Sequence, residues 1–582
     1  MIVNHLRPWR TLSYRRHAIY GLLLLLFGCF LFWKCRYGYA NIDEAFYLTI
    51  PYRLYQGDSL LVHEWHMSQM SALLNLPAVS LFVSVTGGTT GIVLFMRYLC
   101  TTAQIATAAF IYSRFHKLHW LGAVVASLSC LIYTPFGVMA PSYNTLGLMA
   151  TVLSTVIVLT AQTRKPLQYT IAGLVYAAAV LCCPFLAIVF FLYLAVVALM
   201  LLVRKCRRQD LHSEFYFWTF PGAFFLTLGA AIAAVAFFAF LLSRSKIGDI
   251  LHSLPAIFSD PEHPILPLPK MVESFIRNIL EINPWSKPIH LALTGLAIVC
   301  LLDKQRIRHR LIYFPLASIG YFLLILSYWI FRPYINYFMW PMNLLAPFVL
   351  LLSRDKNIKK IVSVSWTTGM LYAFCINASS NQIFYVISST STVATVGSIL
   401  CIALFLQEIS ASEEKAFLRS FATMLVGLIF VTQLCSQTVS RYNSVFWEPD
   451  GMPSLTVKID TGIDAGVYAS EMRAQEYYEA LENLQVLQSY DFENVLFLSR
   501  NTWYYLLGDY RSAAYSAWLS AASELDINIF GTYLSIARDK WPDLVYADGD
   551  YTDFAEEYAA EFGYTIDRTE PVYVLIRDPL AQ

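Results

Sequence analysis

Apolar runs long enough to cross a lipid bilayer recur along this chain from residue 18 to about residue 438. A helix of about 20 apolar residues spans the hydrocarbon core of a membrane. The composition agrees with such a fold, since 57% of the 582 residues are hydrophobic, only 14% are charged and the mean hydropathy is +0.52. The composition excludes that the whole chain is one soluble domain. The sequence therefore predicts a polytopic α-helical membrane protein.

The last quarter of the chain has a different character. Residues 441–582 hold 24 Asp and Glu against 9 Lys and Arg, a net charge of −15, although the whole chain carries +1. Such an acidic, less apolar segment is typical of a water-soluble domain. A helical stretch, 469–487, is followed there by three strand-like runs, 495–499, 544–546 and 571–576. This order predicts a small α/β domain that follows a membrane module of residues 1–440.

Basic residues predict how the chain crosses the membrane. Arg7, Arg10, Arg15 and Arg16 precede the first apolar run, so the N-terminus should be cytoplasmic. Later basic clusters are separated by enough apolar sequence for a hairpin of two spans, and all can face the cytoplasm. An odd number of spans, about 13, places the C-terminal domain outside. The predicted spans are residues 18–33, 91–113, 119–137, 142–160, 168–184, 185–203, 216–242, 289–302, 311–330, 336–353, 361–377, 384–406 and 417–438.

One apolar segment must not cross if this pattern is to hold. Residues 72–87 are short and contain Asn75 and Pro77, and as a span they would turn every later basic loop outward. We expect an interfacial helix there, which makes residues 37–90 one large first outer loop. The Pro-rich residues 243–288 form the second.

Cysteine usage bears on the compartment. All 11 cysteines lie in or beside the predicted spans, and none lies in the first outer loop or after Cys435. Exported parts without disulfides fit the plasma membrane of a bacterium better than a disulfide-rich secretory lumen.

Two adjacent carboxylates, Asp43 and Glu44, stand just beyond the first span. They precede a stretch, 45–57, whose apolar and aromatic residues recur at helical spacing. One interpretation is a helix cap, because carboxylates suit a helix N-terminus. The other is a catalytic base at the membrane surface. Arg97, at the outer start of the second span, is either functional or an interfacial side chain that snorkels to the surface.

Further polar residues of the outer side could bind phosphate. His63 and His66 stand close to Gln69 in the first outer loop, and Arg332 stands on the outer side in the predicted topology. The histidines could equally be ordinary interfacial residues, and Arg332 an anchor beside aromatic residues. Spaced residues of this kind do not make a metal site, so no metal or other cofactor is expected.

The segment 40–100 resembles the polytopic glycosyltransferases of the GT-C superfamily, which use a lipid-phosphate sugar donor. The similarity is to bacterial relatives of the protein O-mannosyltransferases and the lipid A aminoarabinose transferases. It rests on Asp43-Glu44 followed by Tyr47, on Met96-Arg97, and on a plan of about 13 spans with an exported C-terminal domain. The mannosyltransferases continue with His-Pro-Pro and a Lys and the aminoarabinose enzymes with Lys-Pro, whereas this chain has His66-Met-Ser-Gln69.

The resemblance implies a glycosyltransferase that moves a sugar from a polyprenyl phosphate to an extracytoplasmic protein, lipid or glycan, with no nucleic-acid partner. Asp43 or Glu44 would act as the base, and Arg97, helped by His66, Gln69 and Arg332, would bind the donor phosphate. The alternatives are a transporter or flippase of a lipid-linked or small solute, and an envelope scaffold. Transporters carry charges at the centres of their spans, whereas the charges here gather at the outer surface.

Overall fold

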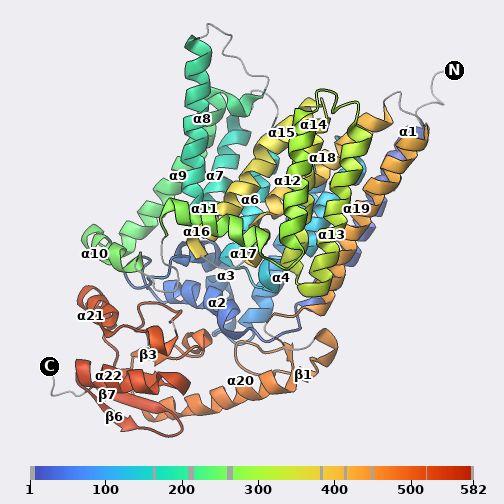
Figure 1. Ribbon diagram of the computed structural model, residues 1–582. Coiled ribbons are helices and arrows are strands. Elements are labelled where there is room, and N and C mark those ends of the chain that lie inside the picture. Colours follow the sequence, from blue (N-terminus) through green and yellow to red (C-terminus); the bar gives the residue numbers. More distant parts are fainter. Residues whose placement is uncertain are drawn as a thin grey trace.

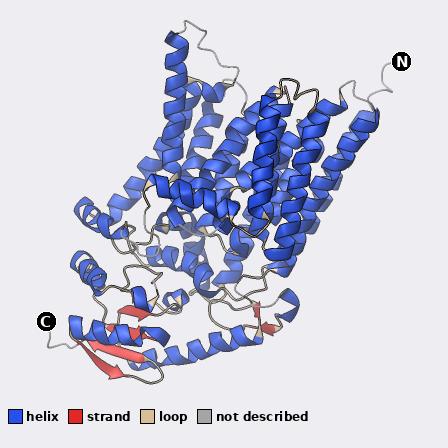
Figure 2. Ribbon diagram, in the orientation of Figure 1, coloured by secondary structure: helices blue, strands red, loops and turns tan. Residues whose placement is uncertain are grey.

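The structure is a computed structural model that describes residues 7–161, 166–206, 215–258, 266–380, 384–411, 416–446, 448, 451–519 and 521–577. It is a long helical bundle with a smaller region of helices and strands at one end (Figures 1 and 2). This confirms the predicted class, a polytopic helical protein with a C-terminal α/β domain. Parts of the predicted basic and Pro-rich loops lie outside the described residues: Arg164, Lys165, Arg207, Arg208, Pro261, Pro264 and Lys415.

The bundle is built from helices that follow the predicted spans. Eleven helices of the described residues are long and apolar enough to cross a membrane, by length and composition. The shorter apolar helices α5, α7 and α12 coincide with three more predicted spans, so the count of 13 stays a prediction. In chain order the bundle contains α1 (Arg7–Lys34), α4 (Ile92–Phe115), α5 (Trp120–Ile132), α6 (Tyr143–Thr160), α7 (Pro166–Cys182), α8 (Leu186–Cys206), α9 (Phe220–Arg244), α12 (Ser286–Leu302), α13 (Arg310–Phe331), α14 (Trp340–Leu352), α15 (Lys356–Ile361), α16 (Thr367–Ser380), α17 (Phe384–Thr390), α18 (Thr392–Ser410) and α19 (Ala416–Asn443).

Small residues let two of these helices touch. A Cβ at Gly173 of α7 would lie 1.9 Å from the Leu226 carbonyl oxygen of α9, and one at Gly229 of α9 would lie 1.8 Å from that of Thr170. Only glycine permits such a reciprocal backbone approach, which is typical of helix pairs in membranes. These contacts define how α7 and α9 cross.

The two predicted outer loops contain helices near the end of the bundle that faces the C-terminal domain. The N-terminus lies at the opposite end (Figure 1). The first loop holds α2 (Asn41–Tyr55) and α3 (Ala72–Thr86), and the second holds α10 (Ile247–Ile257) and α11 (Leu268–Leu280). In α3, Val79 and Val83 are buried, whereas Leu81 and Val85 are exposed. This two-sided helix fits the interfacial position expected for 72–87, although its apolar length would also suffice for a span.

The C-terminal domain is a mixed sheet with helices around it. Its five strands have the order β4-β3-β5-β7-β6, in which β4, β3 and β5 are parallel and β7 and β6 are antiparallel to their neighbours. Predicted strands 495–499, 544–546 and 571–576 correspond to β3, β5 and β7. The elements are β1 (Val457–Lys458), β2 (Tyr468–Ala469), α20 (Glu471–Asn483), β3 (Asn494–Leu498), β4 (Arg511–Ser512), α21 (Ile527–Ile536), β5 (Leu544–Ala547), α22 (Thr552–Phe562), β6 (Tyr564–Arg568) and β7 (Tyr573–Arg577).

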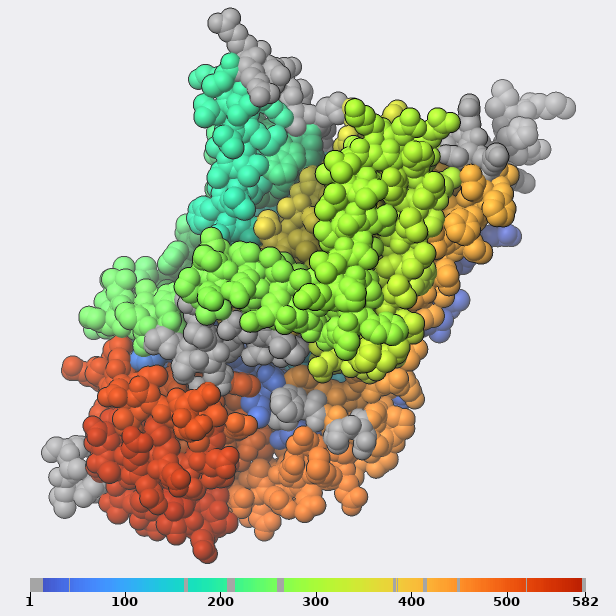
Figure 3. Space-filling view, viewed as in Figure 1, coloured from blue at the N-terminus to red at the C-terminus, as the bar shows by residue number. Residues whose placement is uncertain are grey.

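The core of this domain extends into the first outer loop. Buried side chains of α2, α3 and the start of α4, among them Leu48, Val79 and Met96, belong to the same apolar cluster as Ile459 and Trp503. Backbone hydrogen bonds run across the contact as well: the Gly91 amide donates to the Gly462 carbonyl over 3.0 Å. In the space-filling view, first-loop atoms, coloured blue, show between the bundle and the orange to red domain (Figure 3). The first outer loop is therefore held between two larger bodies.

Candidate functional site

The acidic pair lies in the first turn of α2. Asp43 is half-buried and Glu44 is buried. Carboxylates in the first turn of a helix are stabilised by its dipole. The residue before the helix, Ala40, provides no side-chain hydrogen bond to cap it. The helix dipole thus explains why acidic residues are favoured at this position. The chemical role of each carboxylate depends on its own contacts.

Glu44 forms a buried ion pair with Arg97 of α4. The Arg97 Nε donates to Glu44 Oε1 over 2.8 Å and Nη2 donates to Oε2 over 2.5 Å, so the contact is bidentate. The Ala140 amide donates to the same Oε1 over 2.7 Å. Arg97 also donates to the carbonyls of Cys35 (3.0 Å) and Gly38 (2.8 Å). This cluster ties together the end of α1, the start of α2, α4 and the loop before α6.

Arg97 is therefore not an interfacial residue that snorkels. Its relative exposure is 1%, and four hydrogen bonds engage its guanidinium. The sequence predicted the carboxylate and the arginine as separate parts of one site, and the structure brings them into direct contact. Both carboxylate oxygens of Glu44 are already engaged by Arg97 and the Ala140 amide, so Glu44 is poorly placed to contact an acceptor. Asp43, which is less buried, is the better candidate for a base.

A second buried arginine, Arg441, stands near the end of α19 that leads into the C-terminal domain. Its exposure is 2%, and its Nε and Nη1 atoms have no hydrogen-bond partner within the part of the chain that the structure describes. Glu44 lies close enough to act electrostatically on its charge. The Nη1 atom also faces Gly137, where a Cβ would lie 3.9 Å away. Buried guanidinium nitrogens without hydrogen-bond partners are unfavourable, so this geometry offers a place for an anion.

The side chain of Lys34 fixes the end of α19 that carries Arg441. The Lys34 Nζ donates to the carbonyls of Arg441 and, over 2.7 Å, of Ser444. Sequence reasoning singled out Arg97 at the outer end of one span but passed over Arg441 at the outer end of another. The same signal, an arginine within a turn of the predicted interface, would have found it.

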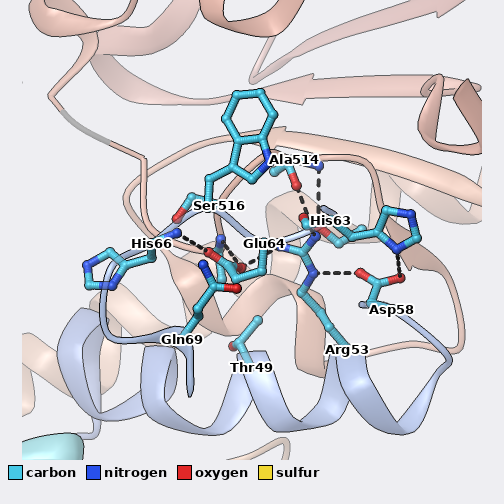
Figure 4. Close-up of polar contacts among 12 residues, drawn as sticks. Thr49, Arg53, Asp58, His63, Glu64, His66, Gln69, Ala514 and Ser516 are labelled. Carbon is cyan, nitrogen blue, oxygen red and sulfur yellow. Dashed lines mark hydrogen bonds and ion pairs between the residues drawn. The ribbon is translucent and has the colours of Figure 1, made fainter. Parts of the chain in front are cut away.

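A second polar cluster joins α2 to the C-terminal domain (Figure 4). Arg53, near the end of α2, donates to Asp58 over 2.8 Å and to Glu64 over 2.7 Å. The Lys540 Nζ contacts Asp58 over 2.5 Å from the domain side. Although burial opposes ionisation, Arg53 and Lys540 hold the pKa of Asp58 below its ordinary value. Burial raises the pKa of Glu64, and the Arg53 charge opposes that rise.

The predicted histidines take different positions around this cluster. His63 and His66 lie on opposite sides of Glu64 (Figure 4). His63 Nε2 is 3.5 Å from an Asp539 carboxylate oxygen, so this side chain belongs to the contact between loop and domain. The His66 ring packs on Phe46, one turn along α2 from Asp43, with ring centroids 4.6 Å apart. Of the two, His66 is the one that contacts the helix carrying the candidate base.

Gln69 follows on the same segment. Its Oε1 accepts a hydrogen bond from the Leu61 amide over 2.6 Å, and its buried Nε2 has no partner within the described ranges. Arg332 lies far along the chain at the end of α13 and is exposed. The structure thus supports a free donor on Gln69 and leaves the predicted role of Arg332 untested. No group of three or more His, Cys, Asp or Glu side chains that could hold a metal occurs among the residues described.

Lys540→Met should detach the domain from α2, because it removes one partner of a buried charge cluster. Breaking such a cluster costs about 3–5 kcal/mol. The matched control is Lys458→Met, since Lys458 pairs with Asp460 over 2.6 Å on the surface, where a pair is worth about 0–1 kcal/mol. We expect a lower melting temperature and faster amide exchange in 58–66 for Lys540→Met alone. Equal behaviour of the two variants would contradict the interpretation.

Asp464 should make the domain contact depend on pH. It is fully buried, and burial raises the pKa of its carboxyl to about 7, with the charge of Arg97 offsetting only part of the rise. A carboxyl whose pKa is higher in the folded than in the unfolded state loses stabilisation as the pH rises from about 4 to 7. We expect Asp464→Asn to raise the melting temperature at pH 8 and to leave it unchanged near pH 4. The exposed Asp460→Asn should have no such effect.

The chain matches no protein-family model, and no curated protein shows significant similarity to it. Solved structures of the oligosaccharyltransferase of Archaeoglobus fulgidus are similar to it. The enzyme tethered to an acceptor peptide with the NVT sequon is 10% identical with a TM-score of 0.47, covering 90% of this chain and 69% of that one. The complex of that enzyme with Zn and sulfate is 11% identical with a TM-score of 0.48, covering 96% of this chain and 73% of that one.

A third structure of that enzyme contains an inhibitory peptide and a dolichol-phosphate, at 11% identity and a TM-score of 0.44, with 90% and 69% coverage. The likeness is one of overall plan and assigns no residue of this chain a role.

Proposed function

We propose that this protein is a membrane glycosyltransferase that transfers a sugar from a polyprenyl-phosphate donor to a hydroxyl-bearing acceptor. The single observation that carries the proposal is the buried Arg441 beside the acidic start of α2, because its Nε and Nη1 atoms have no hydrogen-bond partner among the described residues. A transferase of this class needs a base near the acceptor and a cation on the leaving phosphate. The oxygens of the donor phosphate would accept hydrogen bonds from these two atoms.

Asp43 is the proposed base. It would accept the proton of the acceptor hydroxyl as that oxygen bonds to the anomeric carbon of the sugar. The bond from this carbon to the phosphate oxygen breaks, and the polyprenyl phosphate leaves with both electrons of that bond. Glu44 would act indirectly, because its pair with Arg97 holds the first turn of α2 against α4.

The other predicted phosphate ligands take secondary roles in this proposal. Gln69 has a buried Nε2 without a partner in the described part of the chain, and the His66 ring packs on Phe46, so both are proposed to donate hydrogen bonds to phosphate or sugar. A phosphate contact by Arg97 would need its bonds to Glu44 to rearrange, and a contact by Arg332 stays a prediction. We expect no metal or other cofactor, since the phosphate is already a good leaving group when a guanidinium neutralises it.

The proposed setting is the plasma membrane of a bacterium, with the N-terminus cytoplasmic and the C-terminal domain outside. The position of the candidate site supports this, because it lies at the end of the bundle that carries the domain (Figure 1). A polyprenyl phosphate would present its headgroup at that depth. The acceptor would be a protein, lipid or glycan of the outer side.

The experiment uses the full chain in lipid vesicles with a polyprenyl-phosphate sugar labelled in the sugar ring. A transferase releases polyprenyl phosphate and labels an added cell-envelope extract. A flippase moves the intact donor from one leaflet to the other and releases no polyprenyl phosphate. Translocation without release, in wild-type protein, would overturn the proposal and favour the transporter.

A further inference from the structure

The C-terminal domain contains a cavity of about 580 Å³ that the proposed transfer chemistry does not use. We call it the strand-end pocket. Its polar wall comes from the two segments that follow β3 and β5: Ser499, Arg500, Asn501, Asp548, Asp550 and Asp553. Its volume lies within the range of about 300–1,000 Å³ that is typical of small-molecule sites.

Sheet topology makes this the expected place for a ligand. The strands β3 and β5 are adjacent and parallel, with Leu498 opposite Ala547 in the register. The chain leaves β3 toward β4 on one side and later returns to β5 on the other side. Open parallel sheets bind ligands outside the carboxyl ends of their strands where the connections diverge in this way. The strand-end pocket lies at that point.

The side chains of the pocket form a connected polar wall. The Tyr504 hydroxyl donates to Asp548 Oδ2 over 2.8 Å, and the Asn501 Nδ2 donates to the Tyr504 hydroxyl over 2.8 Å. The Asn501 amide donates to the Ser499 hydroxyl over 3.1 Å. Carboxylate and amide groups held in this way present pairs of polar atoms at fixed positions, which suits neighbouring hydroxyl groups of a ligand.

Charge excludes the phosphorylated donor from this pocket. Three carboxylates, those of Asp548, Asp550 and Asp553, face one guanidinium, that of Arg500. An anionic ligand would be repelled, whereas an uncharged polyol would satisfy both acceptors and donors. The buried aromatic ring of Phe554 provides an apolar surface for the carbon face of a sugar ring.

The pocket is also connected to the helix that carries Asp43. Directly after Asn501, the Thr502 hydroxyl donates to the Ile42 carbonyl over 2.7 Å. The Thr49 hydroxyl donates to the Thr502 carbonyl over 3.0 Å. One short segment therefore lines the pocket at one end and contacts α2 at the other, beside the proposed base.

We propose that the strand-end pocket binds an uncharged sugar unit of a glycan acceptor and places the acceptor over the start of α2. The acceptor role rests on the proposed glycosyltransferase function, whereas sugar binding itself does not. Arg500 and Asp550 are exposed at the pocket mouth and would bond the sugar directly, so their removal should leave the domain folded.

The test measures binding on the full chain in detergent micelles by saturation-transfer-difference NMR. The probes are the methyl glycosides of glucose, galactose, mannose and N-acetylglucosamine, together with cellobiose and chitobiose. Wild-type protein should bind at least one probe. Arg500→Ala and Asp550→Asn should each weaken that binding by about 10-fold or more, the scale of a lost hydrogen bond to a charged group. The control is Glu482→Gln, an exposed carboxylate of α20 outside the pocket, which should bind like wild type.

Two results would overturn the sugar site: no probe binds wild-type protein, or binding is equal in all variants. A donor site would instead show competition between the bound probe and a soluble short-chain polyprenyl phosphate. In the transfer assay with a glycan acceptor, the two pocket variants should raise the acceptor KM and leave the donor KM unchanged. Sugar binding by wild-type protein without any transfer would leave the sugar site intact and contradict the proposed function. Transfer with an unchanged acceptor KM in both variants would leave the proposed function intact and contradict the acceptor role of the pocket.

Discussion

Asp43→Asn is expected to lower sugar transfer by about 100-fold or more, the usual effect of losing a general base. The melting temperature should stay close to that of the wild type, because Asp43 is half-buried and the buried ion pair of the first turn of α2 belongs to its neighbour. Donor affinity should also be retained, since the substitution leaves both nearby arginines in place. The measurements are the single-turnover rate, the donor Kd and thermal unfolding in the same micelles.

Glu44→Gln provides the matched comparison. It leaves Arg97 buried without its carboxylate, which costs about 3–5 kcal/mol in stability, so a lower melting temperature should accompany any loss of transfer. If Asp43→Asn transfers at the wild-type rate and a folded Glu44→Gln protein does not, the base is Glu44. If both transfer normally, the acidic pair has only a structural role.

Arg441→Met and Arg97→Met should have opposite effects. Arg441→Met removes a buried charge that has no partner among the described residues, so the melting temperature without donor should stay the same or rise. Donor affinity should fall by about 100-fold, because a bidentate bond to phosphate is lost. Arg97→Met should lower the melting temperature, since Glu44 then remains buried and unpaired. Thermal unfolding with and without donor, beside the donor Kd, separates the two roles.

The opposite pattern would contradict the assignment. If Arg441→Met keeps donor affinity and Arg97→Met loses it without unfolding, the phosphate lies on Arg97, as the sequence alone suggests. Arg97→Lys then becomes informative, because an ammonium keeps the charge but cannot form two parallel hydrogen bonds. If neither arginine affects the donor, Arg332 is the next residue to test.

Sequence periodicity predicted the fold well for segments that lie in a single apolar setting, either the helical bundle or the core of the C-terminal domain. Predicted spans coincide with bundle helices, and the three predicted strands coincide with β3, β5 and β7. The sequence did not reveal β4, which has two residues, or β6, which is mostly exposed. It also predicted one continuous span over 384–406, where the chain forms α17 and α18. The segment Ser388-Ser-Thr-Ser-Thr392 lies at this break, and hydroxyl side chains there bond to the preceding turn.

The candidate site was predictable in its residue types but not in its pairing. An acidic pair and an arginine near one interface can both be read from the sequence. That Glu44 and Arg97 satisfy each other depends on how α2 and α4 pack, and sequence spacing does not contain that information. Arg441 is distant in the chain from the first outer loop, and only the fold brings it near Glu44. The strand-end pocket likewise follows from strand order, which no local pattern encodes.

The apolar core shared by the first outer loop and the C-terminal domain has a consequence for biosynthesis. Leu48, Val79 and Met96 leave the ribosome long before Ile459 and Trp503, with which they pack. At about 5–20 residues per second, this delay is on the order of a minute. During that time the apolar face of the first outer loop stays uncovered, in reach of chaperones and proteases. The proposed active site is therefore assembled last, and a chain that stops before residue 459 cannot complete it.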